Sequence, residues 1–249
     1  MSPPKVVAVI PARYASTRFP GKPLVKIGGV TMIERVYKQS EKASLVSKVV
    51  VATDDERIAD AVRSFGGQFI ITDNTHETGT DRLAEVASKN PDFDIIVNVQ
   101  GDEPLIDPAA IDAVAQPLVQ DSSIQMSSAA FKIKSAEAQN PMLVKVVLDQ
   151  NNFALYFSRL PIPFHRDEKA NEESCYFGHL GLYAYTRDCL LRIASLQPTP
   201  LEQAEKLEQL RAIENGIRIK VVPFEARSLA VDVPEDIAKV EKALTLSRI

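Results

Sequence analysis

Short apolar runs recur through the first half of the chain, separated by amphipathic stretches. Apolar runs bounded by polar or turn-forming residues are typical of strands buried on both faces of a sheet. Four such runs predict strands at 6–10, 48–52, 68–71 and 94–99.

Helices are predicted between these strands from capping residues and helix breakers. Thr31 and Glu34 have the spacing of a capping box at the start of one helix. A second helix begins near residue 56 and ends before Gly66-Gly67. Further helices are expected over 81–89 and from Asp107-Pro108 onward. Strand alternating with helix predicts βαβ units, and therefore an α/β fold with a three-layer, mostly parallel sheet.

The pattern changes after residue 120. Segments 126–133, 144–148 and 154–157 have β character with no helix between them, which indicates a smaller β-rich lobe at about 125–200. A helix over 199–215, a strand over 217–224 and a final helix from near Pro234 complete the predicted order. We expect one domain over 1–249 that carries this lobe.

The composition indicates which kinds of binding partner and which cellular compartment to expect. Lys and Arg total 29 and Asp and Glu total 33, so the net charge is −4 and no nucleic-acid partner is expected. Cys175 and Cys189 offer neither a disulfide framework nor metal-ligand spacing. No run approaches the roughly 20 apolar residues that span a membrane, and no signal-peptide core is present. We expect a cytoplasmic protein with no membrane insertion.

The loops that follow the strands should carry the site, because ligands bind at the carboxyl ends of parallel strands. These loops are 11–29, 53–55, 72–80 and 100–107. The first brings together cations and hydroxyls, namely Arg13, Ser16, Thr17, Arg18 and Lys22. Neighbouring cations repel one another unless an anion joins them, and phosphate is the obvious anion. A solvated basic loop is the alternative interpretation.

Known nucleotide motifs do not account for this loop. Pro23 follows the Gly-Lys pair, which excludes a Walker A loop, and the chain has no Gly-x-Gly-x-x-Gly for a dinucleotide. Neither a Ser-His-Asp order nor a His-x-x-x-His spacing is present, so we expect neither a hydrolase triad nor a zinc site. His76 and His165 have no partner pattern.

Two carboxylates are candidate magnesium ligands. Asp102 follows the fourth strand, where Gly101 permits a tight turn, and Asp232 lies near the C-terminus. Magnesium prefers one or two carboxylates together with phosphate oxygens. The alternatives are that Asp102 caps the turn before Pro104 and that Asp232 caps the last helix.

Three further positions are candidate binding groups. The loop at 78–82 can bind a base edge or an anion through its amides, or it can be a plain helix cap. Arg159 and His179, in the lobe, suit an acidic sugar, because a guanidinium grips a carboxylate with two hydrogen bonds. A lone histidine is otherwise a structural residue.

Seven collinear segments form a recognisable set: IPARYASTRFPGKPL (10–24), VATDD (51–55), GTDR (79–82), NVQGDEP (98–104), ALYFSR (154–159), HLGLY (179–183) and LEQLR (207–211). In this order they resemble the CMP-Kdo synthetases, the 3-deoxy-manno-octulosonate (Kdo) cytidylyltransferases. The first is shared with other sugar nucleotidyltransferases, whereas the last three are specific to the Kdo enzymes. The resemblance spans nearly the whole chain.

The resemblance implies a nucleotide-diphospho-sugar transferase-like (Rossmann-like) fold and a homodimer. It also implies that CTP and Mg²⁺ are used to activate Kdo for lipopolysaccharide, with release of pyrophosphate. By motif, Arg13 and Lys22 would hold the triphosphate with Ser16 and Thr17 nearby, and Asp102 and Asp232 would bind magnesium. Arg82 and Gln100 would contact the cytidine side, and Thr80 would also belong to the nucleotide site. The sugar site would be lined by Arg159, His179, Tyr183, Glu208 and Gln209.

The chain departs from the family pattern at three places. Gly178 stands where Lys or Arg is usual, Ala230-Val-Asp232 replaces Gly-Val-Asp, with Val233 where Thr is common, and Asn140-Pro-Met142 replaces Asn-Pro-Asn. Two alternatives stay open: a cytidylyltransferase for another acid sugar (amino-Kdo or sialic acid), and a catalytically silent nucleotide-binding module.

Overall fold

The computed structural model describes residues 3–15, 19–166, 176–225 and 229–246. The chain forms two compact units, one from 1–112 with 228–249 and the other from 113–227. Helix α4 (Pro108–Gln120) contains the boundary between them.

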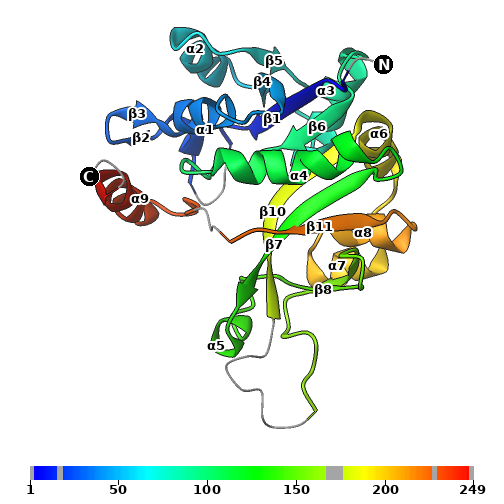
Figure 1. Ribbon diagram of the computed structural model, residues 1–249. Coiled ribbons are helices and arrows are strands. Elements are labelled where there is room, and N and C mark those ends of the chain that lie inside the picture. The colour runs from blue at the N-terminus through cyan, green and yellow to red at the C-terminus, as the bar shows by residue number, and fades with distance from the viewer. Residues whose placement is uncertain (1–2, 16–18, 167–175, 226–228, 247–249) are drawn as a thin grey trace. The chain divides into compact units, whose positions relative to one another are not determined.

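The first unit contains a parallel sheet of strand order β6-β1-β4-β5 (Figure 1). The strands are β1 (Val6–Ala12), β4 (Val46–Thr53), β5 (Phe69–Ile71) and β6 (Ile95–Asn98). Residues 7–10 of β1 are completely buried, as the continuous apolar run requires for a strand covered on both faces. All four predicted strands and their parallel pairing are confirmed.

Helices of this unit are α1 (Met32–Ser40), α2 (Glu56–Ser64), α3 (Gly79–Lys89) and α9 (Asp236–Leu246). The Thr31 cap of α1 is confirmed, since its hydroxyl accepts the Glu34 N–H at 3.4 Å. Val231 and Val240 bring the C-terminal segment back into this unit, where they pack with Ile27 and Met32.

The loop predicted over 11–29 contains structure of its own. It includes the 3₁₀ helix η1 (Lys22–Leu24) and the first strand of a two-stranded antiparallel sheet, β2 (Lys26–Ile27) with β3 (Val30–Thr31). These elements are too short to produce a hydrophobic period.

The second unit contains a mixed sheet of order β11-β7-β10-β8-β9. The strands are β7 (Met126–Ile133), β8 (Lys145–Leu148), β9 (Ala154–Ser158), β10 (Tyr176–Thr186) and β11 (Ile219–Pro223). β11 pairs with β7 in parallel, and the other pairs are antiparallel. β10, the longest of them, is absent from the prediction although its residues alternate between buried and half-buried positions.

Helices of the second unit are α5 (Ser135–Ala138), α6 (Arg187–Ser195), α7 (Pro200–Glu205) and α8 (Gln209–Glu214). The single helix predicted over 199–215 is wrong, because Lys206 adopts a left-handed conformation with φ 54° and divides it. Arg211 then joins α8 to α7 through bonds of 2.8 and 2.6 Å to the Glu202 carboxylate. Among the described helices, none is long and apolar enough to cross a membrane.

Candidate functional site

A cavity of about 260 Å³ lies in the first unit at the carboxyl ends of its strands. It is formed by residues after β1, from η1, from the loop into α3, after β6 and from the C-terminal segment. The lining residues are Pro11, Ala12, Arg13, Lys22, Pro23, His76, Thr78, Gly79, Arg82, Gln100, Gly101, Asp102 and Asp232. Three of the four loops predicted to carry the site therefore line one cavity, as the position of ligands in parallel sheets requires.

Lys22 is held at the centre of the polar groups of this cavity. Its Nζ donates to Asp102 Oδ2 at 2.8 Å and to the Val231 carbonyl at 2.8 Å, and lies 3.8 Å from Asp232 Oδ1. Gly21, at φ 71°, turns the chain into η1 and so presents Lys22. Two carboxylates thus converge on a single cation position, and a divalent metal ion needs the same donor set.

Gly101 allows the Asp102 loop to approach the end of β1. A Cβ at position 101 would lie 3.0 Å from the Pro11 carbonyl oxygen, while the backbone of Gly101 is not left-handed. The expected turn is present, since the Glu103 N–H donates to the Gln100 carbonyl at 3.3 Å, and the glycine is needed there for close approach to β1. On its other side, the loop is held by a 2.9 Å hydrogen bond from the Val231 N–H to the Asp102 carbonyl.

Asp232 is not the cap of the last helix. Helix α9 begins at Asp236, whose Oδ2 accepts the N–H groups of Asp232 at 3.1 Å and Val233 at 3.2 Å. The capping alternative for Asp232 is therefore wrong, and its half-exposed side chain instead faces the Lys22 ammonium.

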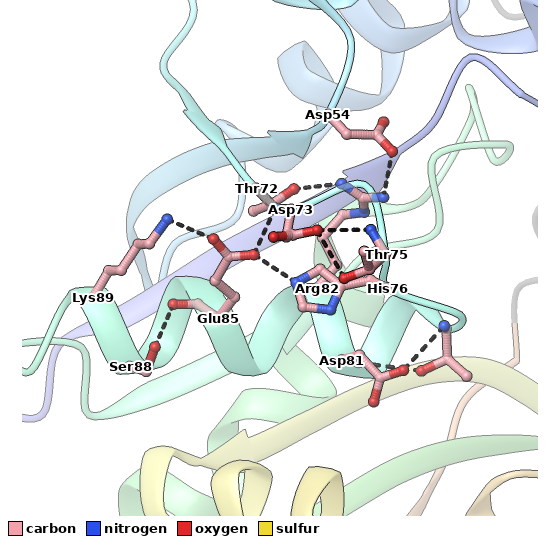
Figure 2. A network of polar contacts seen from close by, with 11 residues as sticks. Asp54, Thr72, Asp73, Thr75, His76, Asp81, Arg82, Glu85, Ser88 and Lys89 are labelled. Carbon is pink, nitrogen blue, oxygen red and sulfur yellow. Dashed lines mark hydrogen bonds and ion pairs between the residues drawn. The ribbon is translucent and has the colours of Figure 1, made fainter.

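Arg82 projects from α3 into a buried polar network (Figure 2). The guanidinium donates to Thr72 and, at 3.0 Å, to Asp54, and its side chain is only 4% exposed. The loop after β4 does not line the cavity, but through Asp54 it binds Arg82, which does. A capping box between Thr78 and Asp81, with both bonds at 3.1 Å, fixes the start of α3. Thr80 is buried there and does not line the cavity.

His76, in the loop before α3, also belongs to this network. Its Nε2 contacts the Glu85 carboxylate, which also binds the Asp73 N–H and Lys89 Nζ. Burial raises the pKa of Glu85, but these hydrogen bonds outweigh it and lower that pKa to about 2. His76, which has no partner pattern in the sequence, therefore has a partner in the structure. The only sign of this contact in the sequence is the carboxylate of Glu85, nine residues after His76.

Arg159, at the end of β9 in the second unit, is held by backbone carbonyls. Its Nε donates to the Glu205 carbonyl at 2.7 Å, and its two terminal nitrogens donate to Pro141 at 3.2 Å and Lys206 at 3.3 Å. The buried Lys145 ammonium in turn binds the Arg159 carbonyl. A guanidinium has five N–H donors, and two of these have no acceptor among the described residues, which is the number that a bidentate carboxylate needs.

His179 and Tyr183 lie along β10 with their rings 5.3 Å apart. Burial lowers the pKa of His179 to about 3, and its Nε2 lies 2.8 Å from Ser128 Oγ. Burial, and secondarily the charge of Glu208, raise the pKa of Tyr183 well above its ordinary value. Both side chains are therefore neutral at physiological pH. Gln209, at the start of α8, is also buried.

Comparison with known proteins places this geometry in a family. The family model described as Cytidylyltransferase matches residues 7–219. The 3-deoxy-manno-octulosonate cytidylyltransferase of Geobacter metallireducens is 55% identical over 254 residues, covering 98% of this chain and 100% of its own. That of Geotalea daltonii is also 55% identical, with 96% and 98% covered. The chain belongs to the cytidylyltransferase family.

Solved structures agree with this assignment. A CMP:2-keto-3-deoxy-manno-octonic acid synthetase complexed with CTP matches with a TM-score of 0.92 and 44% identity, over 98% of this chain and 100% of that one. The 4-diphosphocytidyl-2C-methyl-D-erythritol synthase of Anaerococcus prevotii matches at TM-score 0.65 and 14% identity over 97% of this chain and 99% of that one, a likeness of fold alone. The predicted nucleotide-diphospho-sugar transferase-like fold is thereby confirmed.

The predicted site residues of this cytidylyltransferase divide between the two units. Arg13, Lys22, Arg82, Gln100, Asp102 and Asp232 line the cavity of the first unit. The predicted sugar-site residues Arg159, His179, Tyr183, Glu208 and Gln209 all lie in the second. Ser16 and Thr17 lie outside the described residues. Within the described ranges, no group of three or more His, Cys, Asp or Glu side chains gathers as a metal site, so a metal here has at most two protein carboxylates.

Gly178, which stands where Lys or Arg is usual in the family, lies against Phe131 of the neighbouring strand. Gly178 on β10 pairs directly with Phe131 on β7, and a Cβ at position 178 would lie 2.9 Å from the Phe131 ring. The aromatic ring thus covers the glycine across the strands. Any larger residue at 178 requires Phe131 to move.

Proposed function

We propose that this chain transfers the cytidylyl group of CTP to Kdo, forming CMP-Kdo and pyrophosphate for lipopolysaccharide synthesis. The observation that carries the proposal is the convergence of Lys22, Asp102 and Asp232 in one cavity of the first unit. The names and identities of the relatives support the substrates.

The reaction needs no covalent protein intermediate. A sugar hydroxyl oxygen forms a bond to the α-phosphorus of CTP and loses its proton, while the bond from that phosphorus to the bridging oxygen breaks and pyrophosphate leaves with the electron pair. Catalysis of this kind depends on positioning and on neutralising phosphate charge. Arg13 and Lys22 would supply that charge. Arg82 and Gln100, which line the cavity, would contact the cytidine side.

Magnesium fits the donor set of the cavity. Asp102 and Asp232 would hold it, because both carboxylates already lie within 4 Å of one cation, the Lys22 ammonium. When bound, the ion would neutralise phosphate charge and favour ionisation of the attacking hydroxyl.

The acid sugar would bind in the second unit. The two Arg159 donors without an acceptor in the described part of the chain suit its carboxylate. The neutral His179 and Tyr183 would bind hydroxyl groups, with Glu208 and Gln209. A homodimer and a cytoplasmic location belong to the same proposal and rest on the family resemblance.

The test is pyrophosphate release from CTP and Mg²⁺ with a panel of acid sugars. We expect release with Kdo in preference to amino-Kdo and sialic acid. Preference for one of the others would identify a related cytidylyltransferase, since the nucleotide half would be unchanged. Binding of CTP without release for any sugar would indicate a silent nucleotide-binding module and contradict the proposal.

A further inference from the structure

His76 and Glu85 form a contact at the edge of the cavity. This contact determines whether His76 offers a ligand a hydrogen-bond donor or an acceptor. His76 lines the cavity, with its side chain 20% exposed, and Glu85 lies behind it on α3 with its side chain 16% exposed. Figure 2 shows the imidazole with one nitrogen directed at the Glu85 carboxylate.

The Glu85 carboxylate is an obligate acceptor. With a pKa of about 2 it is ionised at neutral pH, and an ionised carboxylate has no hydrogen to donate. Its Oε2 accepts the Asp73 N–H at 2.8 Å and faces His76 Nε2, while Oε1 accepts from Lys89. The hydrogen of the His76–Glu85 bond must therefore reside on Nε2. In the neutral imidazole, the other nitrogen, Nδ1, is then an acceptor that points away from Glu85.

The loop that carries His76 is held in place by the residues just before the histidine. Asp73 Oδ1 accepts the Thr75 N–H at 2.8 Å and the Thr75 hydroxyl at 2.7 Å, and Glu85 fixes Asp73 itself. The position of the His76 ring is thus set before a ligand arrives, which is what a selective hydrogen bond requires.

The neighbouring groups of the cavity are hydrogen-bond donors, whereas His76 Nδ1 is an acceptor. Arg82 is a donor only, and the first amides of α3 are also donors. An acceptor beside donors matches the edge of cytosine, whose exocyclic amine donates and whose ring nitrogen and carbonyl accept. Uracil presents a carbonyl where cytosine has the amine, and this carbonyl would face the lone pair of Nδ1.

We propose that His76 is a base-selecting residue, whose Nδ1 accepts the exocyclic amine of CTP, and that Glu85 positions it by holding the hydrogen on Nε2. This inference rests on the proposed cytidylyl transfer. A site built to hydrogen-bond a substrate group discriminates strongly against the analogue that lacks it.

The experiment compares kcat/KM for CTP and UTP in pyrophosphate release. His76→Phe keeps a planar ring without nitrogens and should lower the CTP-over-UTP ratio by about 10-fold or more, whereas His76→Asn, with an amide oxygen near the place of Nδ1, should recover part of it. Glu85→Leu should lower the ratio by about 3- to 10-fold, and Glu85→Gln, which keeps an acceptor, should stay near the wild type. Lys89→Ala is the matched control, because Lys89 binds the other Glu85 oxygen, and should leave the ratio unchanged.

A second readout does not depend on turnover. Nitrogen-15 NMR of the histidine rings in the nucleotide-free protein at pH 8 should show His76 protonated at Nε2, and CTP should shift Nδ1 more than UTP does. An unchanged ratio in His76→Phe, or a hydrogen on Nδ1, would overturn the inference. A wild-type protein that releases no pyrophosphate from CTP would instead refute the proposed function, and the NMR result would still decide the state of His76.

Discussion

Lys22 and Asp102 form an ion pair of 2.8 Å between residues 80 positions apart in the sequence. The Val231 carbonyl accepts a second hydrogen bond from the same ammonium, also at 2.8 Å. Because one cation joins η1, the loop after β6 and the C-terminal segment, the geometry of the cavity depends on this contact.

Replacing Asp102 with asparagine should separate catalysis from folding. Asp102→Asn removes the charge that would hold magnesium, so pyrophosphate release should fall by more than about 100-fold. The ion pair is partly exposed and such pairs contribute at most about 1 kcal/mol, so the melting temperature should change by less than about 4 °C. Activity and thermal unfolding of the same preparation check both statements, and near-wild-type release would contradict the role of Asp102.

Adding a methyl group at Gly101 should destabilise the protein. The new Cβ would lie 3.0 Å from the Pro11 carbonyl oxygen, a backbone atom that cannot swing away. We expect Gly101→Ala to lower the free energy of unfolding by about 1–3 kcal/mol. Gly181→Ala is the control, since nothing lies within 4 Å of that Cβ, and should change it by less than about 0.5 kcal/mol. Equal effects in denaturant unfolding would mean that close approach at Gly101 is unimportant.

His179 should make stability depend on pH on the acid side. Burial lowers the pKa of His179 from 6.5 to about 3, so between these values the unfolded chain binds a proton that the folded chain does not. Stability should therefore fall as the pH drops from 6.5 toward 3, with a slope of up to about 1.4 kcal/mol per pH unit from this residue. Urea unfolding at several pH values should show this loss of stability in the wild type, and the part due to His179 should be absent in His179→Phe. Curves that stay parallel below pH 6.5 would refute the assignment.

Arg159→Lys should weaken the sugar and spare the nucleotide. Lysine keeps the charge but loses the planar fork, and one charged hydrogen bond contributes about 1.5–3 kcal/mol, or roughly 10- to 150-fold in affinity. The KM for Kdo should rise by about that factor while the KM for CTP stays constant. A rise in the KM for CTP alone would show that the second unit does not bind the sugar through Arg159.

The pair Gly178 and Phe131 should be energetically coupled. Gly178→Ala places a Cβ 2.9 Å from the Phe131 ring and should cost about 1–3 kcal/mol of stability. In a Phe131→Val background the same change should cost less, by a coupling energy of at least about 0.5 kcal/mol. Additive effects in a double-mutant cycle would show that the ring and the glycine do not restrain each other.

Several features follow from the sequence because they depend on local rules. Apolar runs locate β1, β4, β5 and β6, since a parallel strand must be buried on both faces. The Thr31 cap is recognised because its bond reaches only to the third residue beyond it. The loops after these strands are candidates for the site because parallel strands end at one edge of the sheet.

Other elements are not predicted by these local rules. β10 carries glycine and histidine inside an aromatic strand, so its alternation is hidden from a hydrophobic pattern. Lys206 breaks one predicted helix into two through a backbone conformation that a lysine rarely adopts. The sequence order alone does not show either outcome.

The sequence by itself determined which residue types stand in the loops of the first unit, and these residue types predict a site for an anionic substrate and a metal ion. Only the tertiary structure decided their partners: Lys22 with Asp102, His76 with Glu85, and the Asp236 carboxylate with the N–H groups of Asp232 and Val233. The physical reason is range. A helix cap or a strand pattern is set by neighbours along the chain, whereas a hydrogen bond or ion pair of about 3 Å depends on how separate elements meet in space.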